Sequence, residues 1–334
     1  MPFQSHINRH ALVGAAMLAL SLCAIALGLA VGSEGWSGWG TGFSDVGATI
    51  VWELRWPRSV GAWLAGALLG LAGALGQSLF RNPLADPYLL GSASGAGLGV
   101  ALGLVAASGT WAWLQAIAPW TGGVLAFVGA WGAVALALWW SRGLTHTPRL
   151  LLAGVVVGVV LSAVTSALML MVPQAWNTFQ SFMLGTTQTL DVQAIRTLGL
   201  GLCAAVVLAL VAGRALDVLS LGESTALSLG LDLGRSRAWL LMSMTLATSL
   251  AVSHTGLIAF VGLAAPHMVR SMVSVRPSSL WPLAALAGGL LLTLADLVSR
   301  WWWAPLEWPV GVLTALIGGL YLLYRLNQPA GKMA

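Results

Sequence analysis

The sequence predicts an all-α, polytopic membrane protein with about ten transmembrane helices, and three observations carry this prediction. Hydrophobic residues make up 58% of the 334 residues and charged residues only 7%, with a mean hydropathy of +0.87. A soluble globular domain usually carries about 25% charged residues. The apolar runs reach the length of about 20 residues that crosses a hydrocarbon core. Since no large water-soluble domain is indicated, residues 1–334 are expected to form one membrane domain.

The apolar runs, and the Gly, Pro and Arg residues that interrupt them, predict ten spans. They cover approximately residues 11–31, 58–79, 89–106, 119–140, 150–171, 192–212, 236–254, 257–273, 280–299 and 309–326. The first run follows Arg9 and ends in small residues, as the core of a signal peptide does. Its greater length favours an uncleaved span.

The basic residues predict the orientation, because they collect in the cytoplasmic loops of membrane proteins. With the N-terminus in the cytoplasm, eleven of the fifteen Lys and Arg residues fall on the cytoplasmic side. These are Arg9, Arg81, Arg142, Arg149, Arg214, Arg235, Arg237, Arg270, Arg276, Arg325 and Lys332. The outer side then holds Arg55, Arg58, Arg196 and Arg300. Both termini are therefore expected in the cytoplasm, and the pI near 10 needs no nucleic-acid partner.

Several kinds of chemistry are missing from the sequence. The single lysine, Lys332, has no glycine-rich loop before it, so a phosphate-binding loop is excluded. Neither HExxH nor GxSxG occurs, and no spacing pairs a serine with a histidine. Cys23 and Cys203 fall inside predicted spans, where they are expected to be small buried residues rather than metal ligands. No catalytic, metal or cofactor site is therefore expected in this chain.

The energy source for transport must then lie elsewhere. Carriers that are coupled to ions bury ionisable groups inside the membrane, and Asp296 is the one acidic residue within a predicted span. This pattern favours a membrane conduit that is driven by another chain. Two rival classes remain open: a self-sufficient secondary carrier, and an intramembrane enzyme with an essential Ser or His.

One polar segment between two spans, "ALDVLSLGESTALSLGLDLGRSR" at residues 215–237, suits contact with such a chain. Gly222 and Gly230 punctuate it, Asp217 and Ser220 can cap helices, and Leu227 shares a helical face with Glu223. Two short helices with a kink are expected, and they would present a docking ridge on the cytoplasmic face. The alternative is an ordinary interfacial helix.

Small residues recur at four-residue spacing in the third and fifth spans. Gly91, Gly95, Gly99 and Gly103 follow this spacing in the third span. Such residues let helix backbones approach closely. In the fifth span the polar edge formed by Ser162, Thr165 and Ser166 either packs in the same way or lines a path.

Five stretches, in order, resemble the permease subunits of type II ATP-binding cassette (ABC) importers, which take up iron–siderophore complexes, haem and cobalamin. The stretches are "LRWPRSVGAWLAGALLGLAGALGQSLFRNPLADPYLLGSASGAGLG" (54–99), "LLLAGVVVG" (150–158), "LSLGESTALSLGLDLGR" (219–235), "GLIAFVGLAAPHMVR" (256–270) and "LADLVSR…EWPVGVLTALIG" (294–318). The sequence departs from the family pattern at Phe182, Thr186 and Gly319, which weakens any inference about the substrate.

The resemblance implies a complex in the bacterial inner membrane. A second permease copy (or a close paralogue), two cytoplasmic ATPase subunits that bind ATP and Mg²⁺, and a periplasmic substrate-binding protein would complete it. The permease itself would hold no cofactor. Import of an iron complex, a ferric siderophore or haem, by alternating access is the leading expectation, and import of cobalamin is the alternative.

The resemblance also assigns residues, and these assignments are expectations for the structure to test. Coupling to the ATPases, within helices at about 217–231, falls to Leu221, Gly222, Glu223, Ser224, Ala226, Leu227, Leu229 and Gly230. Docking of the binding protein falls to Arg55, Arg58 and Arg300. The gate and the translocation path fall to Asn82, Leu84, Thr147, Ser162, Thr165 and Ser166.

Overall fold

The computed structural model describes residues 2–33, 35, 36, 38, 45–108, 123–141 and 147–327, without the side chains of 2–8, 45, 46, 147, 214, 325 and 326. Within these ranges the regular secondary structure is helical apart from one small antiparallel pair, β1 (Val31–Gly32) and β2 (Gly35–Trp36). The predicted all-α fold is confirmed.

Each of the ten predicted ranges overlaps one helix of 12 residues or more, although α1 begins well before its range. These helices are α1 (Pro2–Ala30), α3 (Trp56–Leu79), α4 (Ser92–Ala107), α5 (Gly123–Trp140), α6 (Thr147–Met171), α8 (Val192–Ser220), α10 (Leu233–Thr255), α11 (Val261–Met272), α12 (Pro277–Trp301) and α13 (Val310–Leu326). The helix in the eighth range, α11, begins later than predicted. Gly256 and Phe260 both have a φ of +68°, and the helix starts only after them. The sixth continues past the apolar run to Ser220.

The described residues also form five shorter helical elements: α2 (Asp45–Thr49), a π-helix (Ile50–Arg55), a 3₁₀ turn (Pro173–Ala175), α7 (Trp176–Leu184) and α9 (Glu223–Ser228). By length and composition, six helical stretches within the described ranges can cross a membrane: 9–30, 47–79, 123–140, 148–171, 192–213 and 277–301. Residues 92–107 and 310–324 form shorter apolar helices.

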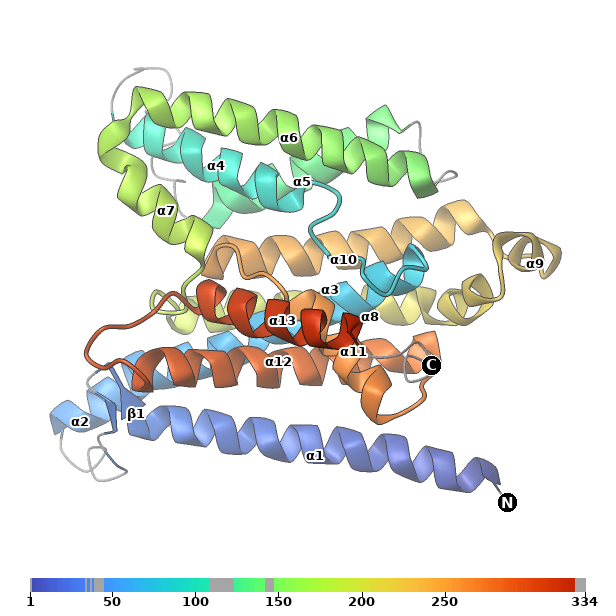
Figure 1. The fold of residues 1–334 in the computed structure, drawn as a ribbon, viewed down its shortest axis with the longest axis horizontal. Coiled ribbons are helices and arrows are strands. Elements are labelled where there is room, and N and C mark those ends of the chain that lie inside the picture. The colour runs from blue at the N-terminus through green and yellow to red at the C-terminus, as the bar shows by residue number, and fades with distance from the viewer. Residues whose placement is uncertain are drawn as a thin grey trace.

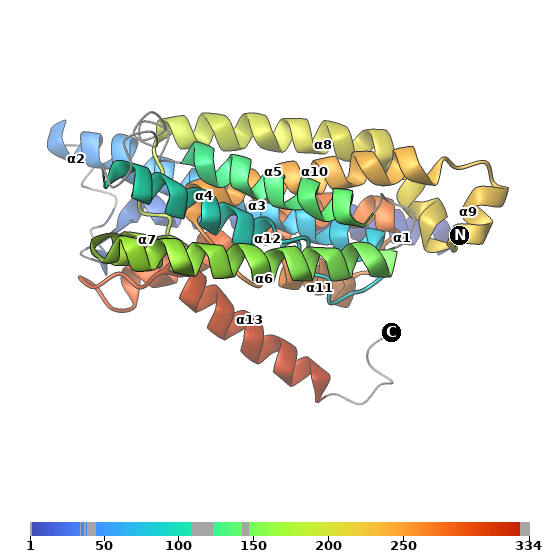
Figure 2. The same ribbon diagram turned by 90° about the horizontal axis from the view of Figure 1, so that it is seen from above.

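The long helices run roughly side by side, so the molecule has two ends (Figure 1). At one end, called the α9 end, lie α9 and the first turns of α1 (Figure 2). At the other, called the α2 end, lie α2 and the start of α7 (Figure 2). Helix α3 is the centre of the bundle and packs on α1, α8, α10, α11 and α12. Most of its residues are buried, and they form part of one large apolar core.

Glycines bring the central helices into backbone contact. A Cβ atom added to Gly66 or Gly70 of α3 would overlap the carbonyl oxygen of Gly288 or Ala284 in α12. One added to Gly73 would overlap the Gly262 carbonyl of α11. Without a side chain at these positions the helix axes approach closely, as small residues allow in membrane bundles.

The predicted glycine stripe of the third span packs in the same way. Gly95 and Gly99 of α4 lie against the carbonyl oxygens of Gly129 and Leu125 in α5. The packing interpretation is therefore the right one for these two positions. The expectation for the cysteines is wrong, because Cys23 and Cys203 are both exposed on the outer faces of their helices.

We predict that Gly70→Ala destabilises the protein by about 1–3 kcal/mol, the usual effect of inserting a methyl group into a packed interior. The reason is the overlap with the Ala284 carbonyl, which belongs to the backbone and cannot rotate away. Thermal unfolding of the purified protein in detergent measures the change. Gly132→Ala is the matched control, since nothing lies within 4 Å of its added Cβ. An equal loss of stability in both variants would contradict this account.

Candidate coupling, gate and docking sites

The polar segment between α8 and α10 forms one short helix, α9, held between two glycine turns. Gly222 and Gly230 have φ angles of +113° and +76°, which glycine adopts far more readily than other residues. Helix α10 then begins after Asp232, whose carboxylate accepts a hydrogen bond from the Arg235 amide at 3.0 Å. The prediction of two short helices is wrong, because residues 217–220 belong to the last turn of α8.

The surface of this segment carries three exposed leucines among polar side chains. Leu221, Leu227 and Leu229 are 64%, 60% and 64% exposed at the α9 end of the molecule. Ser224 and Gly230 are also exposed. Ala226, predicted to belong to the coupling surface, is fully buried, so its side chain cannot contact another chain. Exposed leucines this close together in the chain are typical of a surface that another protein covers.

The Glu223 carboxylate points at two arginines of the same chain. Its Oε1 atom accepts hydrogen bonds from Arg237 Nη2 at 2.5 Å and from Arg81 Nη2 at 3.1 Å. Arg237 belongs to α10 and Arg81 to the segment between α3 and α4. Sequence reasoning assigned no site role to either arginine. Arg81 stands 142 positions away from Glu223 in the sequence, so no local sequence pattern connects the two residues.

Asp217 and Ser220 do not cap α9. The Asp217 carboxylate accepts hydrogen bonds from the amide and the hydroxyl of Ser278, at 2.9 and 2.6 Å. It therefore caps the first turn of α12 from a neighbouring helix. The Ser220 hydroxyl donates to the backbone carbonyl of Asp217 at 2.6 Å.

The arginines that were predicted for docking lie at the α2 end, but they are largely used inside the molecule. Arg300 is 1% exposed, so a docked protein cannot reach its side chain in this structure, and its assignment to the rim is wrong. The Arg58 side chain is 12% exposed and forms two ion pairs. Arg55 is half-buried and donates from Nη1 to the Leu29 carbonyl at 3.0 Å.

Asp296 is the centre of a buried cluster of charged side chains that includes Arg58 and Arg300. Its carboxylate accepts hydrogen bonds from Arg300 Nη2 at 2.5 Å, Arg58 Nε at 3.0 Å and Thr187 Oγ1 at 2.5 Å. The Glu307 carboxylate binds Arg58 at 2.8 Å, and it accepts a hydrogen bond from Gln188 at 2.8 Å. Sequence reasoning singled out Asp296 as an acid within a span but missed its partners.

Arg300 joins this cluster to the end of α1. Its Nη1 donates to the carbonyl oxygens of Gly28 and Val31, both at 3.2 Å, and its Nη2 donates to the Ser59 hydroxyl at 3.2 Å. The guanidinium is thus surrounded by acceptors, as a buried charge requires.

Two of the three predicted gate residues, Asn82 and Leu84, lie in the segment between α3 and α4. Asn82 and Leu84 are exposed, and the Asn82 side-chain oxygen accepts a hydrogen bond from the Leu84 amide at 2.9 Å. Nearby, burial raises the pKa of the Asp86 carboxyl, and a hydrogen bond from the Tyr88 amide at 2.8 Å partly opposes this rise. Thr147 is the first residue of α6, and its side chain lies outside the described residues.

The polar edge of α6 borders a groove of about 170 Å³ together with α4 and α7. The Ser162 hydroxyl donates to the Ser94 hydroxyl at 3.1 Å across this groove, and Ser166 is exposed beside it. Thr165 also lines the groove but is 6% exposed and donates to the Leu161 carbonyl. None of the described residues that line the groove is charged.

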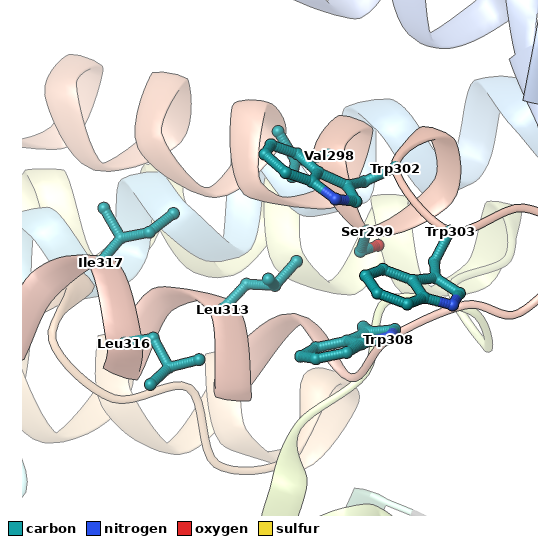
Figure 3. A pocket seen from close by; sticks show the side chains of 8 residues that line it. All are labelled: Val298, Ser299, Trp302, Trp303, Trp308, Leu313, Leu316 and Ile317. Atoms are coloured by element: carbon teal, nitrogen blue, oxygen red, sulfur yellow. The ribbon is translucent and has the colours of Figure 1, made fainter.

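A second, apolar cavity of about 330 Å³ lies between α12 and α13, at the α2 end. Figure 3 shows Trp302, Trp303 and Trp308 around it, with Leu313 and Leu316 extending from α13. Trp301, Trp302 and Trp303 are all exposed at the end of α12. Exposed tryptophans at the end of a helix are typical of the aromatic belt at a membrane interface.

Comparison with known proteins places this arrangement among transport proteins. The model of the FecCD transport family matches residues 12–328. The vitamin B12 import system permease protein BtuC of Salmonella paratyphi A is 35% identical over 312 residues, which cover 93% of this chain and 91% of that protein. The BtuC protein of Citrobacter koseri is 34% identical over 314 residues, which cover 92% of this chain and 91% of that protein.

Solved structures share the fold. A metal-chelate type ABC transporter in an inward-facing conformation superposes with a TM-score of 0.81 at 25% sequence identity, covering 94% of this chain and 99% of that chain. PsaBC of Streptococcus pneumoniae, solved with a Fab, superposes with a TM-score of 0.58 at 16% identity over 82% of this chain and 91% of that chain. The second likeness concerns the fold alone.

We predict that Asp296→Ala lowers the free energy of unfolding by about 3–5 kcal/mol, the usual effect of leaving buried charges without their partner. Arg300 would then lie buried without its carboxylate partner, and Arg58 would lose one of its two ion pairs. Unfolding in detergent, followed by tryptophan fluorescence, measures this loss.

Glu53→Ala is the matched control for Asp296→Ala, because Glu53 is an exposed acid at the same end of the molecule. We expect it to change stability by less than about 0.5 kcal/mol. If Asp296→Ala proved as stable as this control, the cluster would not be a stabilising element.

Proposed function

Because this chain belongs to the FecCD transport family of ABC importer permeases, we propose that it carries cobalamin inward across the bacterial inner membrane. The observation that carries the proposal is the identity to vitamin B12 permeases along nearly the entire chain. This ranks cobalamin above the iron complex that the sequence analysis placed first. A ferric siderophore or haem is the second candidate, supported by the likeness to a metal-chelate type transporter.

Membership of this family means that ATP is hydrolysed by a separate subunit. Permeases of ABC importers do not hydrolyse ATP, and this chain is accordingly a transport subunit rather than an enzyme. A partner ATPase and a substrate-binding partner complete such an importer. ATP and Mg²⁺ are therefore ligands of the partner ATPase in our proposal.

We place ATPase coupling on the exposed part of the polar segment. Leu221, Leu227 and Leu229 are well exposed, and α9 lies at one extreme of the molecule (Figure 2). An apolar ridge of this kind fits a cleft in a partner, where a few buried anchors supply most of the binding energy. The α9 end would then face the cytoplasm, which agrees with the bias of the basic residues.

A second copy of the chain would complete the path. Helices α6 and α13 lie towards the same side of the bundle (Figure 2). Each exposes a stripe of apolar side chains. The stripes include Val155, Val156, Val159, Val160, Leu316, Ile317 and Leu320. Two such faces around a two-fold axis would enclose the groove at Ser162 and Ser166. A path lined by hydroxyl and apolar groups would hold a large chelate weakly, which lets it pass.

We propose that the gate at the cytoplasmic side involves Asn82, Leu84 and Thr147. The first two are exposed in a segment that turns at the α9 end, between α3 and α4. Exposed loop residues can move without disrupting the core. Alternating access would then open this side after cargo has entered from the α2 end.

The substrate-binding protein would dock at the α2 end. Of the three predicted arginines, Arg55 and Arg58 keep some exposure, and they remain in the proposal. Their positive charge would meet acidic groups on the partner and guide its approach. Arg300 has no part in this contact, because it is buried.

We predict that Leu227→Glu weakens binding of the ATPase at least about tenfold, a change of about 1.4 kcal/mol. The charge would be placed at the centre of the exposed ridge, where desolvating it opposes association. Titration of the ATPase onto the permease in nanodiscs measures the affinity. Leu306→Glu, an equally exposed leucine at the α2 end, is the control and should bind like the wild type. Equal affinities for all three proteins would remove the ridge from the interface.

Transport itself is tested in proteoliposomes that contain the permease, its ATPase and internal ATP, with the binding protein outside. We expect uptake of radiolabelled cobalamin that needs all three proteins. Ferric siderophores and haem are offered in parallel, so that the same experiment ranks the cargoes.

Two outcomes would contradict parts of this proposal. Uptake of an iron complex without uptake of cobalamin would make the iron complex the cargo. It would leave the proposal of an ABC importer unchanged. Uptake by the permease alone, abolished by a protonophore and indifferent to ATP, would make the chain a secondary carrier.

A further inference from the structure

The Glu223 carboxylate occupies the point where three segments meet at the α9 end. It is the first residue of α9, and its Oε1 atom binds Arg237 of α10 and Arg81 of the α3–α4 segment. Both arginines use the same oxygen atom. Any displacement of α9 therefore moves the acceptor of both hydrogen bonds together.

The two arginines differ in how firmly they are held. The Arg237 side chain is 5% exposed within the packed start of α10, whereas the Arg81 side chain is 42% exposed. The pair with Arg237 therefore anchors Glu223 to the bundle. The pair with Arg81 lies at the surface, where it can form and break at little free-energy change.

Arg81 directly precedes the proposed gate residues. Its backbone has a φ of +48°, a left-handed conformation that non-glycine residues rarely adopt. Such conformations occur at switch regions when the surrounding structure enforces them. The end of α3 beside it is fixed, because Gln77 binds Arg270 at 2.5 Å and the Asn82 amide donates to the Gln77 carbonyl at 3.1 Å. The segment thus begins at a fixed point, and the Arg81 side chain near its start reaches to α9.

We propose that Glu223 is a positioning residue, and that the Arg81–Glu223 ion pair transmits movement of α9 to the segment that carries Asn82 and Leu84. This proposal rests on the proposed coupling role of α9. It reassigns Glu223 from the docking surface to the link between the docking surface and the gate. The neighbouring leucines bind the ATPase, and the carboxylate passes on their displacement.

The test uses the reconstituted complex and measures the cargo imported per ATP hydrolysed. Arg81→Ala should lower this ratio about fivefold, the lower end of what coupled sites usually show. ATP hydrolysis and ATPase affinity should stay at wild-type levels. Arg81→Lys should restore most of the ratio, because it keeps a positive charge. Both variants retain a Cβ atom, so the left-handed backbone is equally strained in each.

Two further proteins sharpen the comparison. Arg276→Ala removes another exposed arginine at the α9 end and should leave the ratio unchanged. Arg81→Ala combined with Glu223→Gln should lower the ratio no further than either change alone, since both remove the same link.

The outcomes separate this inference from the proposed function. A wild-type complex that imports radiolabelled cobalamin or another chelate, with an unchanged ratio in Arg81→Ala, overturns the inference alone. A parallel loss of ATPase affinity in Arg81→Ala also overturns it, because the residue would then belong to the interface. A wild-type complex that imports none of the chelates overturns the proposed function together with the inference.

Discussion

The Asp296 carboxylate is the interaction on which the α2 end of the protein depends. It binds Arg58 from α3, Arg300 from its own helix and Thr187 from the segment before α8. Arg300 in turn reaches the carbonyl groups at the end of α1. Charges buried in a low-dielectric interior must be paired, because each one is strongly unfavourable alone. One acidic side chain thereby fixes the relative positions of four segments that are distant in the sequence.

The two ends of the molecule use charge in opposite ways. At the α2 end Asp296, Arg58 and Arg300 are largely buried and satisfy one another, so this end has a defined geometry. At the α9 end Glu223 keeps 40% of its side-chain surface exposed, and three leucines beside it have no cover in this chain. Such an end is stable as it stands but presents a surface that a partner can use. Between the ends, α3 provides a continuous buried axis.

The helices could be predicted from the sequence, but many side-chain roles could not. Apolar runs indicate where long helices form, so each predicted range overlaps one of them, although α1 begins before its range and α8 ends after its range. The pattern at 215–237 correctly placed the glycine turns at Gly222 and Gly230 but wrongly predicted two short helices, because residues 217–220 continue α8. The burial of Arg300 and Ala226 and the pairing of Glu223 depend on which helices become neighbours. A partner such as Arg81, 142 positions from Glu223, leaves no local signal. For the same reason the family resemblance assigned Arg300 to docking of the binding protein, although its side chain is buried in the bundle.

The backbone contacts between α3 and α12 limit how this protein can change shape. Helices that interlock through side chains can slide, since rotamers adjust, but two backbones in direct contact have no such tolerance. The centre of the bundle must therefore move as one rigid body. Helix α13 behaves differently, because it diverges from the bundle along its length (Figure 2) and leaves apolar cavities against α12. Conformational change in this permease is consequently confined to its periphery, where a helix can pivot while the core stays intact.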